Sequence, residues 1–227
     1  MDDGYLDNYT NALPVFSKYD VPYTVFIASD FPNKKCILWW YALEDLLQQN
    51  DSLVLNDGTV VVCKTLEEKN AAFNVLRSRI LQFNQKEVKE NFEKLFGSYK
   101  IDWNKYTEGC LSWNDIEKLN QSKLVTIGAH TAHHYNLHAL KNEQEVKEEI
   151  SEGINEMAKN LNGFKPAFFA YPYGAPSEIG EREKKVLAQM DFKCAFIGTG
   201  RGVKKHTKLN AIPRIALTEN FDISVLK

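Results

Sequence analysis

Short apolar runs that alternate with amphipathic stretches constrain the fold of this chain more than any other feature of its sequence. These runs are rich in β-branched and aromatic residues, as is typical of buried strands. They lie at residues 21–28, 124–127, 166–170, 194–197 and 210–217. Apolar side chains recur at helical spacing over residues 142–161, and a further helix is predicted at 178–190. Alternating strands and helices indicate an α/β protein with a mostly parallel sheet.

The length and charge of the chain exclude several classes of protein. Its 227 residues are enough for one sizeable domain with a hydrophobic core. A net charge of −2 without any basic run argues against a nucleic-acid partner. No apolar run approaches the roughly 18 residues that a transmembrane helix needs. No signal peptide is visible, which leaves the cell envelope and the cytoplasm both open as locations.

The four cysteines are scattered along the chain and include no CxxC pair. This pattern argues against a thiolate zinc site and gives no disulfide framework, so free thiols are expected.

Residues 33–110 do not follow the alternation of strands and helices. A hairpin is predicted around Asn56-Asp57-Gly58, and helices are predicted at 39–47 and within 66–96. We therefore interpret this stretch as a mostly helical insertion into a single domain that spans residues 1–227. Trp39 and Trp40 have two interpretations, which are core packing and a surface for stacking on sugar rings.

Three histidines, His130, His133 and His134, directly follow the predicted central strand. If the backbone coils into a helical turn there, His130 and His134 project from the same side. Two imidazoles on one face are a common way to bind zinc or a similar divalent ion, although a histidine-containing loop without metal is the simpler alternative. Such a site needs another ligand, usually a carboxylate, and the best candidates lie in Asp2-Asp3-Gly4 at the start of the chain.

Four polar segments fall at the carboxyl ends of predicted strands, where parallel sheets carry their active residues. They are residues 2–4, residues 130–134, Tyr171-Pro172-Tyr173-Gly174 and residues 198–202. The last segment, Gly-Thr-Gly-Arg-Gly, lacks the lysine ending and the following helix of a phosphate-binding loop. The convergence of these segments at one edge of the sheet predicts a functional site there.

The order and spacing of three motifs resemble those of the polysaccharide deacetylases, the fourth family of carbohydrate esterases. The motifs are Asp2-Asp3-Gly4-Tyr5, Ile127 to Leu137 with its His-Thr-Ala-His-His core, and Phe169 to Gly174. This resemblance covers nearly the whole chain apart from the insertion. It implies a distorted β/α barrel with seven or fewer strands.

The resemblance also implies a role for each motif residue. Asp2 would be the general base, while Asp3, His130 and His134 would hold a divalent metal, with Zn²⁺ the first choice. Tyr173 would donate its backbone N–H to the oxyanion. The implied activity is removal of acetyl groups from a polysaccharide or a glycolipid sugar, with an acetylated glycan as the binding partner.

The chain departs from the family pattern in its strands and in its catalytic motifs. The first barrel strand has no counterpart, so Asp2 and Asp3 are expected on a terminus that frays. Ala170 replaces the arginine of the third motif, and Arg214 is a candidate substitute that orients Asp2, or else a purely structural arginine. The late Leu-His motif is not recognisable, which leaves His206 as either the general acid or a solvated loop residue.

Three functions therefore stay open from the sequence. The first is a metal-dependent carbohydrate deacetylase. The second is a degenerate module that binds glycan without turnover, and the third is a metallohydrolase that acts on a small amide. The sequence sets no oligomeric state.

Overall fold

A five-stranded parallel sheet forms the centre of the molecule. The structure is a computed structural model that describes residues 1–217 and residue 221. The strands follow one another across the sheet in chain order, with every neighbouring pair parallel. They are β1 (Tyr23–Ile27), β4 (Val125–Ala129), β5 (Phe168–Ala170), β6 (Cys194–Ile197) and β7 (Ile212–Pro213). The α/β class and the parallel sheet predicted from the sequence are confirmed.

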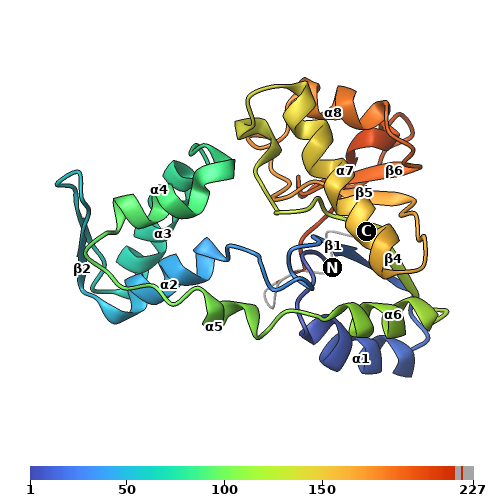
Figure 1. Cartoon of the computed structure of the whole chain (residues 1–227), viewed down its shortest axis with the longest axis horizontal. Coiled ribbons are helices and arrows are strands. Elements are labelled where there is room, and N and C mark those ends of the chain that lie inside the picture. Colours follow the sequence, from blue (N-terminus) through green and yellow to red (C-terminus); the bar gives the residue numbers. More distant parts are fainter. Residues whose placement is uncertain (218–220, 222–227) are drawn as a thin grey trace.

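Helices pack around the sheet and cover its core (Figure 1). They are α1 (Leu13–Lys18), α6 (Trp113–Gln121), α7 (Glu143–Asn160) and α8 (Glu181–Ala188). Buried side chains of α6, α7 and α8 join one hydrophobic cluster with Val25, Ile127 and Phe169 of the strands. The helix α7 begins where the sequence predicts, because the side chain of Asn142 accepts a hydrogen bond from the backbone N–H of Glu145. Ser112 and Asp115 form a capping box at the start of α6.

The first helix begins with a π-helical turn, Asn8–Ala12, before α1, and Asp7 makes no capping hydrogen bond there. One predicted strand differs from that observed. The last strand is restricted to Ile212–Pro213 instead of extending over 210–217. The N–H of Arg214 still donates to the carbonyl of Ile197 at 2.8 Å, so the pairing with β6 ends just after Pro213. Because β7 is an edge strand, it tolerates the missing N–H of the proline.

The first residues of the chain lie against β1 instead of fraying. The amino group of Met1 donates to the carbonyl of Thr24 at 2.7 Å, and the N–H of Phe26 donates back to Met1 at 2.9 Å. The N–H of Ala28 donates to the carbonyl of Asp3 at 3.0 Å. This is the hydrogen-bond pattern of a parallel pair, and it fixes Asp2 and Asp3 beside the carboxyl end of β1.

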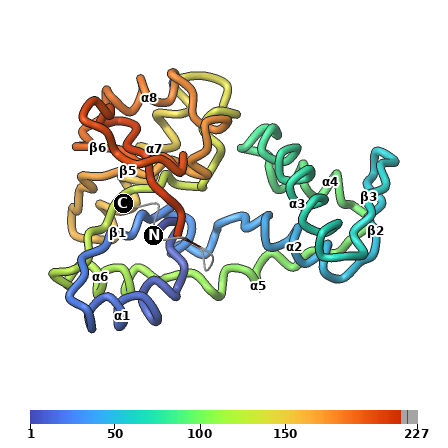
Figure 2. The backbone as a smooth tube through the Cα atoms, turned by 180° about the vertical axis from the view of Figure 1, so that it is seen from behind, coloured from blue at the N-terminus to red at the C-terminus, as the bar shows by residue number. Residues whose placement is uncertain are grey.

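Residues between β1 and α6 form a lobe beside the sheet (Figures 1 and 2). The lobe contains α2 (Trp39–Gln49), β2 (Ser52–Val54), β3 (Val60–Val62), α3 (Leu66–Ile80), α4 (Val88–Leu95) and α5 (Asn104–Thr107). The predicted hairpin is present, since β2 and β3 pair antiparallel. The lobe has a hydrophobic core of its own, which includes Leu43, Leu76, Ile80, Phe92 and Phe96.

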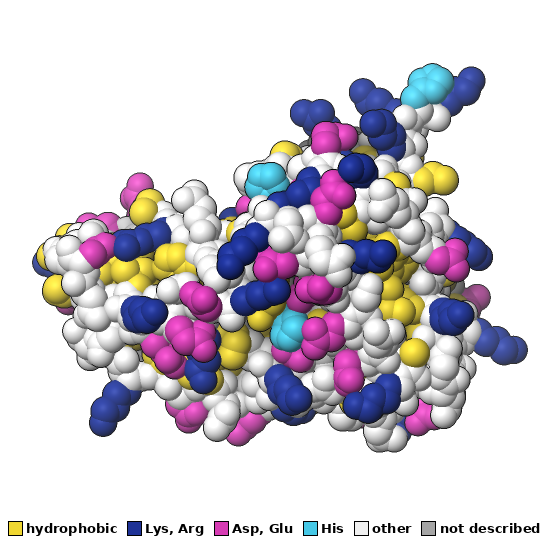
Figure 3. All heavy atoms as spheres, turned by 45° about the horizontal axis from the view of Figure 1, so that its top comes forward, with side chains coloured by type: hydrophobic (Ala, Val, Ile, Leu, Met, Phe, Trp, Pro, Cys, Tyr) yellow, Lys and Arg dark blue, Asp and Glu magenta, His cyan; other side chains and the backbone are white. Residues whose placement is uncertain are grey.

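The two connections to the lobe meet at a pair of buried cysteines. The Sγ atoms of Cys36 and Cys110 lie 3.7 Å apart, and all four cysteines carry free thiols, as expected from the sequence. None of the helices within the described residues has both the length and the apolar character that a bilayer crossing requires. Basic and acidic side chains are interspersed on the face shown in Figure 3, in line with the small net charge.

Candidate metal centre

The turn after β4 brings His130 and His134 together by a geometry that the sequence did not predict. We expected a helical turn, but Thr131 and His134 have φ angles of 72° and 60°, in the left-handed region. The hydroxyl of Thr131 accepts a hydrogen bond from the backbone N–H of His134 at 3.1 Å, which stabilises the tight turn. The prediction that both imidazoles face the same side holds, although its stated cause was wrong.

Both histidines face Asp3. The Nε2 atoms of His130 and His134 each lie 3.1 Å from Oδ1 of Asp3. The side chains of the two histidines are 1% and 7% exposed, so little water competes for their ring nitrogens. Two distant parts of the sequence therefore supply one compact group of three donor atoms that could hold a metal ion.

The protonation of His130 indicates that a cation fits between these donors. Nδ1 of His130 lies 2.7 Å from the carbonyl oxygen of Ala170, so this nitrogen carries the proton that it donates. In a neutral imidazole, Nε2 then has a lone pair, which faces an oxygen of Asp3 that also only accepts. A cation between them satisfies both atoms. Two imidazoles and one carboxylate suit zinc and similar divalent ions.

Asp3 is ionised in this environment. Burial acts to raise the pKa of Asp3, but the adjacent His134 and His130 outweigh it and hold that pKa well below its usual range. The group therefore offers a carboxylate, which is the form that binds a metal.

Asp2 forms a bidentate ion pair with Arg214. The two guanidinium nitrogens lie 2.7 and 2.6 Å from the two carboxylate oxygens. The guanidinium is held over the rings of Phe26 and Phe196, at 5.5 and 6.0 Å from their centroids. Burial acts to raise the pKa of Asp2, but Arg214 outweighs it and keeps the pKa below its usual value. Arg214 therefore lies where it can orient Asp2, which is the position that the sequence analysis suggested for it.

The loop after β5 presents an unpaired backbone N–H beside the histidines. Tyr173 has a φ of 62°, and its N–H has no acceptor among the residues that the structure describes. Its ring lies 4.7 Å from that of His134, and its hydroxyl accepts a hydrogen bond from the indole N–H of Trp39 at 3.1 Å. The side chain of Tyr173 is thus held between His134 and the lobe.

Glu149 on α7 holds the turn after β4 by hydrogen bonds. Its carboxylate accepts hydrogen bonds from the N–H groups of Ala132 and His133 at 3.2 and 2.7 Å, and from Nδ1 of His133 at 2.7 Å. Burial acts to lower the pKa of His133, but Glu149 outweighs it and raises the pKa to about 9. The sequence analysis missed Glu149, although a carboxylate on the buried face of an amphipathic helix was a detectable signal.

A glycine of α7 lets the helix approach the histidine turn. A Cβ added at Gly153 would lie 2.4 Å from the carbonyl oxygen of Thr131. Gly153→Ala is expected to lower the free energy of unfolding by about 1–3 kcal/mol, because the turn must move away. It is also expected to weaken metal affinity about 10–100-fold, as loss of an outer-shell support does.

Thermal unfolding and metal titration of the Gly153→Ala protein measure both effects. Gly109→Ala is the matched control, because a Cβ at Gly109 would have no neighbour within 4 Å. Unchanged metal affinity in the Gly153→Ala protein would show that α7 does not set the geometry of the turn.

The candidate metal centre lies in a cleft of about 390 Å³ between the sheet and the lobe. The sheet side contributes Asp2, Asp3, His130, His134 and Tyr173, and the lobe contributes Trp39, Trp40, Phe73 and Arg77. Trp39 and Trp40 line the cleft, and Trp39 is also part of the lobe core. The sequence analysis missed Phe73 and Arg77, because the face of α3 that borders the cleft depends on how the lobe packs against the sheet.

His206 does not reach this cleft. It is exposed on the loop that follows β6 and does not line the cavity. The start of this loop stays near the site, since the N–H groups of Gly198 and Gly200 donate to the carbonyls of Gly174 and Arg214 at 2.8 and 3.0 Å. The assignment of His206 as the general acid stays a prediction.

The chain was compared with curated proteins and with solved structures. No curated protein matches the chain. Three solved structures share its fold with a TM-score of 0.57 each. They are the BpsB deacetylase domain from Bordetella bronchiseptica (12% identity, 94% of this chain, 68% of that chain), the deacetylase PplD from Streptococcus pyogenes in complex with acetate (15%, 96%, 63%) and a de-N-acetylase from Aggregatibacter actinomycetemcomitans (14%, 99%, 71%).

At such identities the structural likeness shows the fold alone, and the chain spans about two thirds of the length of those structures. The family assignment rests on the sequence. Residues 1–195 match the model of the polysaccharide deacetylases. With most of its length covered by that match, the chain belongs to the polysaccharide deacetylase family.

Proposed function

We propose that this protein is a metal-dependent hydrolase that removes N-acetyl groups from the sugars of a polysaccharide or glycolipid. The observation that carries the proposal is the convergence of Asp3, His130 and His134 around one point. A carboxylate that is not one of these three donors, that of Asp2, lines the same cleft. This combination matches the needs of acyl hydrolysis, which are a cation site and a base.

Each residue has a role in this reaction. A divalent cation bound by Asp3, His130 and His134 would polarise the acetyl carbonyl and lower the pKa of a water molecule. The carboxylate of Asp2 takes the proton of the attacking water, and Arg214 keeps that carboxylate ionised and oriented. The N–H of Tyr173 donates to the oxyanion of the tetrahedral intermediate. When the C–N bond of that intermediate breaks, the departing amine takes up the proton that Asp2 removed from water, and acetate is released. The cleft itself receives the acetylated sugar.

A binding module without turnover is the second candidate, supported by Ala170 in place of the third-motif arginine. The pairing of Asp2 with Arg214 speaks against it, because a module that only binds glycan has no need for an oriented base. Acetate release from chitin oligomers distinguishes the two. The protein is to be stripped with a chelator and then reloaded with one equivalent of Zn²⁺.

Acetate release that disappears with the metal and returns with it is the expected result. Stoichiometric metal and tight oligomer binding without acetate would instead favour the binding module. Release of acetate from small amides but from no oligomer would favour the third function, a small-amide metallohydrolase.

Arg214→Met is expected to move the acidic limb of the pH profile of kcat/KM to higher pH. Arg214 lowers the pKa of Asp2, so its removal raises that pKa, and the base must be ionised to act. At neutral pH, kcat is also expected to fall about 100-fold, because the carboxylate loses its fixed orientation. Arg214→Lys keeps a positive charge and is expected to shift the limb less. An acidic limb that stays in place in the Arg214→Met protein would remove Arg214 from this role.

A further inference from the structure

We propose that α2 and α3 of the lobe form a groove that binds further sugar units of the glycan chain, beyond the unit at the metal centre. This inference rests on the proposed function and extends it to the length of the substrate. No residue of the groove belongs to the three motifs of the sequence analysis, so the groove would be a contribution of the inserted lobe.

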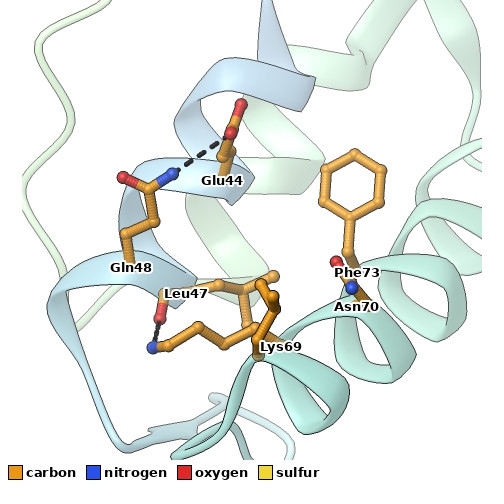
Figure 4. A pocket seen from close by; sticks show the side chains of 7 residues that line it. Glu44, Leu47, Gln48, Lys69, Asn70 and Phe73 are labelled. Carbon is orange, nitrogen blue, oxygen red and sulfur yellow. Dashed lines mark hydrogen bonds between the residues drawn. The ribbon is translucent and has the colours of Figure 1, made fainter. Parts of the chain in front are cut away.

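A second cavity, of about 300 Å³, adjoins the metal cleft. It lies between α2 and α3 and is lined by Glu44, Leu47, Gln48, Leu66, Lys69, Asn70 and Phe73 (Figure 4). Phe73 lines both this cavity and the metal cleft. Phe73 therefore borders both cavities, and a chain that leaves the cleft past Phe73 enters the outer cavity.

The spacing of the lining residues shows that α3 runs along this path. Leu66, Asn70, Phe73 and Arg77 recur at intervals of four, three and four, which places them on one face of the helix. The first two line the outer cavity, and Arg77 lines the metal cleft. At 1.5 Å per residue this face is roughly 16 Å long, which is more than one sugar ring.

The opposite wall comes from α2, which runs in the reverse sense. Trp40 near its start lines the metal cleft, while Glu44 and Gln48, one and two turns later, line the outer cavity. These three residues are four apart and share a face. Each of the two helices therefore supplies residues to both cavities, so they form two walls of one continuous groove.

The side chains of the groove suit an uncharged, hydroxyl-rich ligand. Phe73 is half-buried and offers an aromatic surface to the apolar face of a sugar. The amide of Gln48 donates to Glu44 at 3.1 Å, which leaves its carbonyl oxygen free to accept. The side chain of Asn70 is exposed and has no hydrogen-bond partner among the described residues.

Lys69, the basic residue that lines the outer cavity, already binds backbone carbonyls. The ammonium of Lys69 donates to the carbonyl oxygens of Leu47 and Asn50 at the end of α2. It therefore closes the base of the groove instead of serving as an anion site. With Glu44 as the other charged group on the walls, a sugar fits this cavity better than a phosphate or carboxylate does.

The test compares chitin oligomers of two lengths. Asn70→Ala and Gln48→Ala are expected to lower kcat/KM for acetate release from the hexamer about 5–10-fold each, as expected for one lost hydrogen bond. Release from the dimer, which occupies the metal cleft alone, is expected to be unchanged. Asn74→Ala and Gln49→Ala are matched controls, since both residues are exposed on the same helices and line neither cavity.

The ratio of kcat/KM for the chitin hexamer to kcat/KM for the chitin dimer is the deciding quantity. If this ratio is the same in the wild type and in both variants, the proposed groove is rejected. If the metal-loaded wild type releases no acetate at all, the proposed function fails, and the groove is judged by binding instead. Calorimetric titration of the hexamer then decides: weaker binding in both groove variants than in the controls supports the groove, and equal affinities reject it.

Discussion

His130→Ala is expected to abolish stoichiometric metal binding and, with it, acetate release. The substitution leaves Asp3 and His134 as the only donors of the group, and two ligands do not form a zinc site of the kind that proteins use. It also removes the donor to the carbonyl of Ala170, which ties the turn after β4 to the end of β5. Both changes loosen the geometry of the two donors that remain.

Elemental analysis of the purified protein, after dialysis against one equivalent of Zn²⁺, measures this loss directly. His206→Ala is the matched control, because His206 is exposed and does not line the cleft, and this variant is expected to keep one metal per chain. Circular dichroism separates loss of the ligand from loss of the fold. One equivalent of metal in a folded His130→Ala protein would disprove the ligand assignment.

The strands and helices of the sheet domain could mostly be predicted, because the spacing of apolar residues shows which side chains of a segment are buried. The strand predicted at 194–197 has the same bounds as β6. The apolar stripe predicted over 142–161 forms the buried face of α7. Both signals depend on which side chains face the core, and periodicity encodes that directly. The last strand was predicted too long, because the chain leaves β6 soon after Pro213 although the apolar run continues to Leu217.

The candidate site was predicted in its residues but not in its geometry. Asp3, His130 and His134 meet as the motifs implied, yet they do so through left-handed residues that no periodicity reveals. The contact of Arg214 with Asp2 joins residues 212 positions apart, and only the chain-order sheet, which lays β7 against β6, brings them together.

The contribution of the lobe to the cleft could not be predicted from sequence. Phe73 and Arg77 lie on a helix whose amphipathic pattern describes its packing inside the lobe. Which of its remaining faces borders the metal centre depends on how the lobe lies against the sheet. That arrangement depends on contacts between distant segments, such as the hydrogen bond from Trp39 to Tyr173.

Asp2→Asn is expected to retain the metal and to lower kcat about 10²–10⁴-fold, the range that general-base catalysis supplies. Asparagine has the same shape as aspartate, so the cleft stays filled, but an amide cannot take a proton from water. The pKa of Asp2 is held below its usual value, so the wild type acts through its carboxylate over the whole neutral range.

Metal content and acetate release, measured on the same preparation of the Asp2→Asn protein, separate the base from the ligands. Asp7→Asn is the matched control: Asp7 is exposed, lies five residues further along the chain and does not line the cleft. Retained metal with lost turnover assigns the proton transfer to Asp2, since Asp3 and the histidines alone bind the ion. A rate close to that of the wild type would show that another group takes the proton. In that case the ion pair with Arg214 serves to hold the first residues of the chain against the sheet.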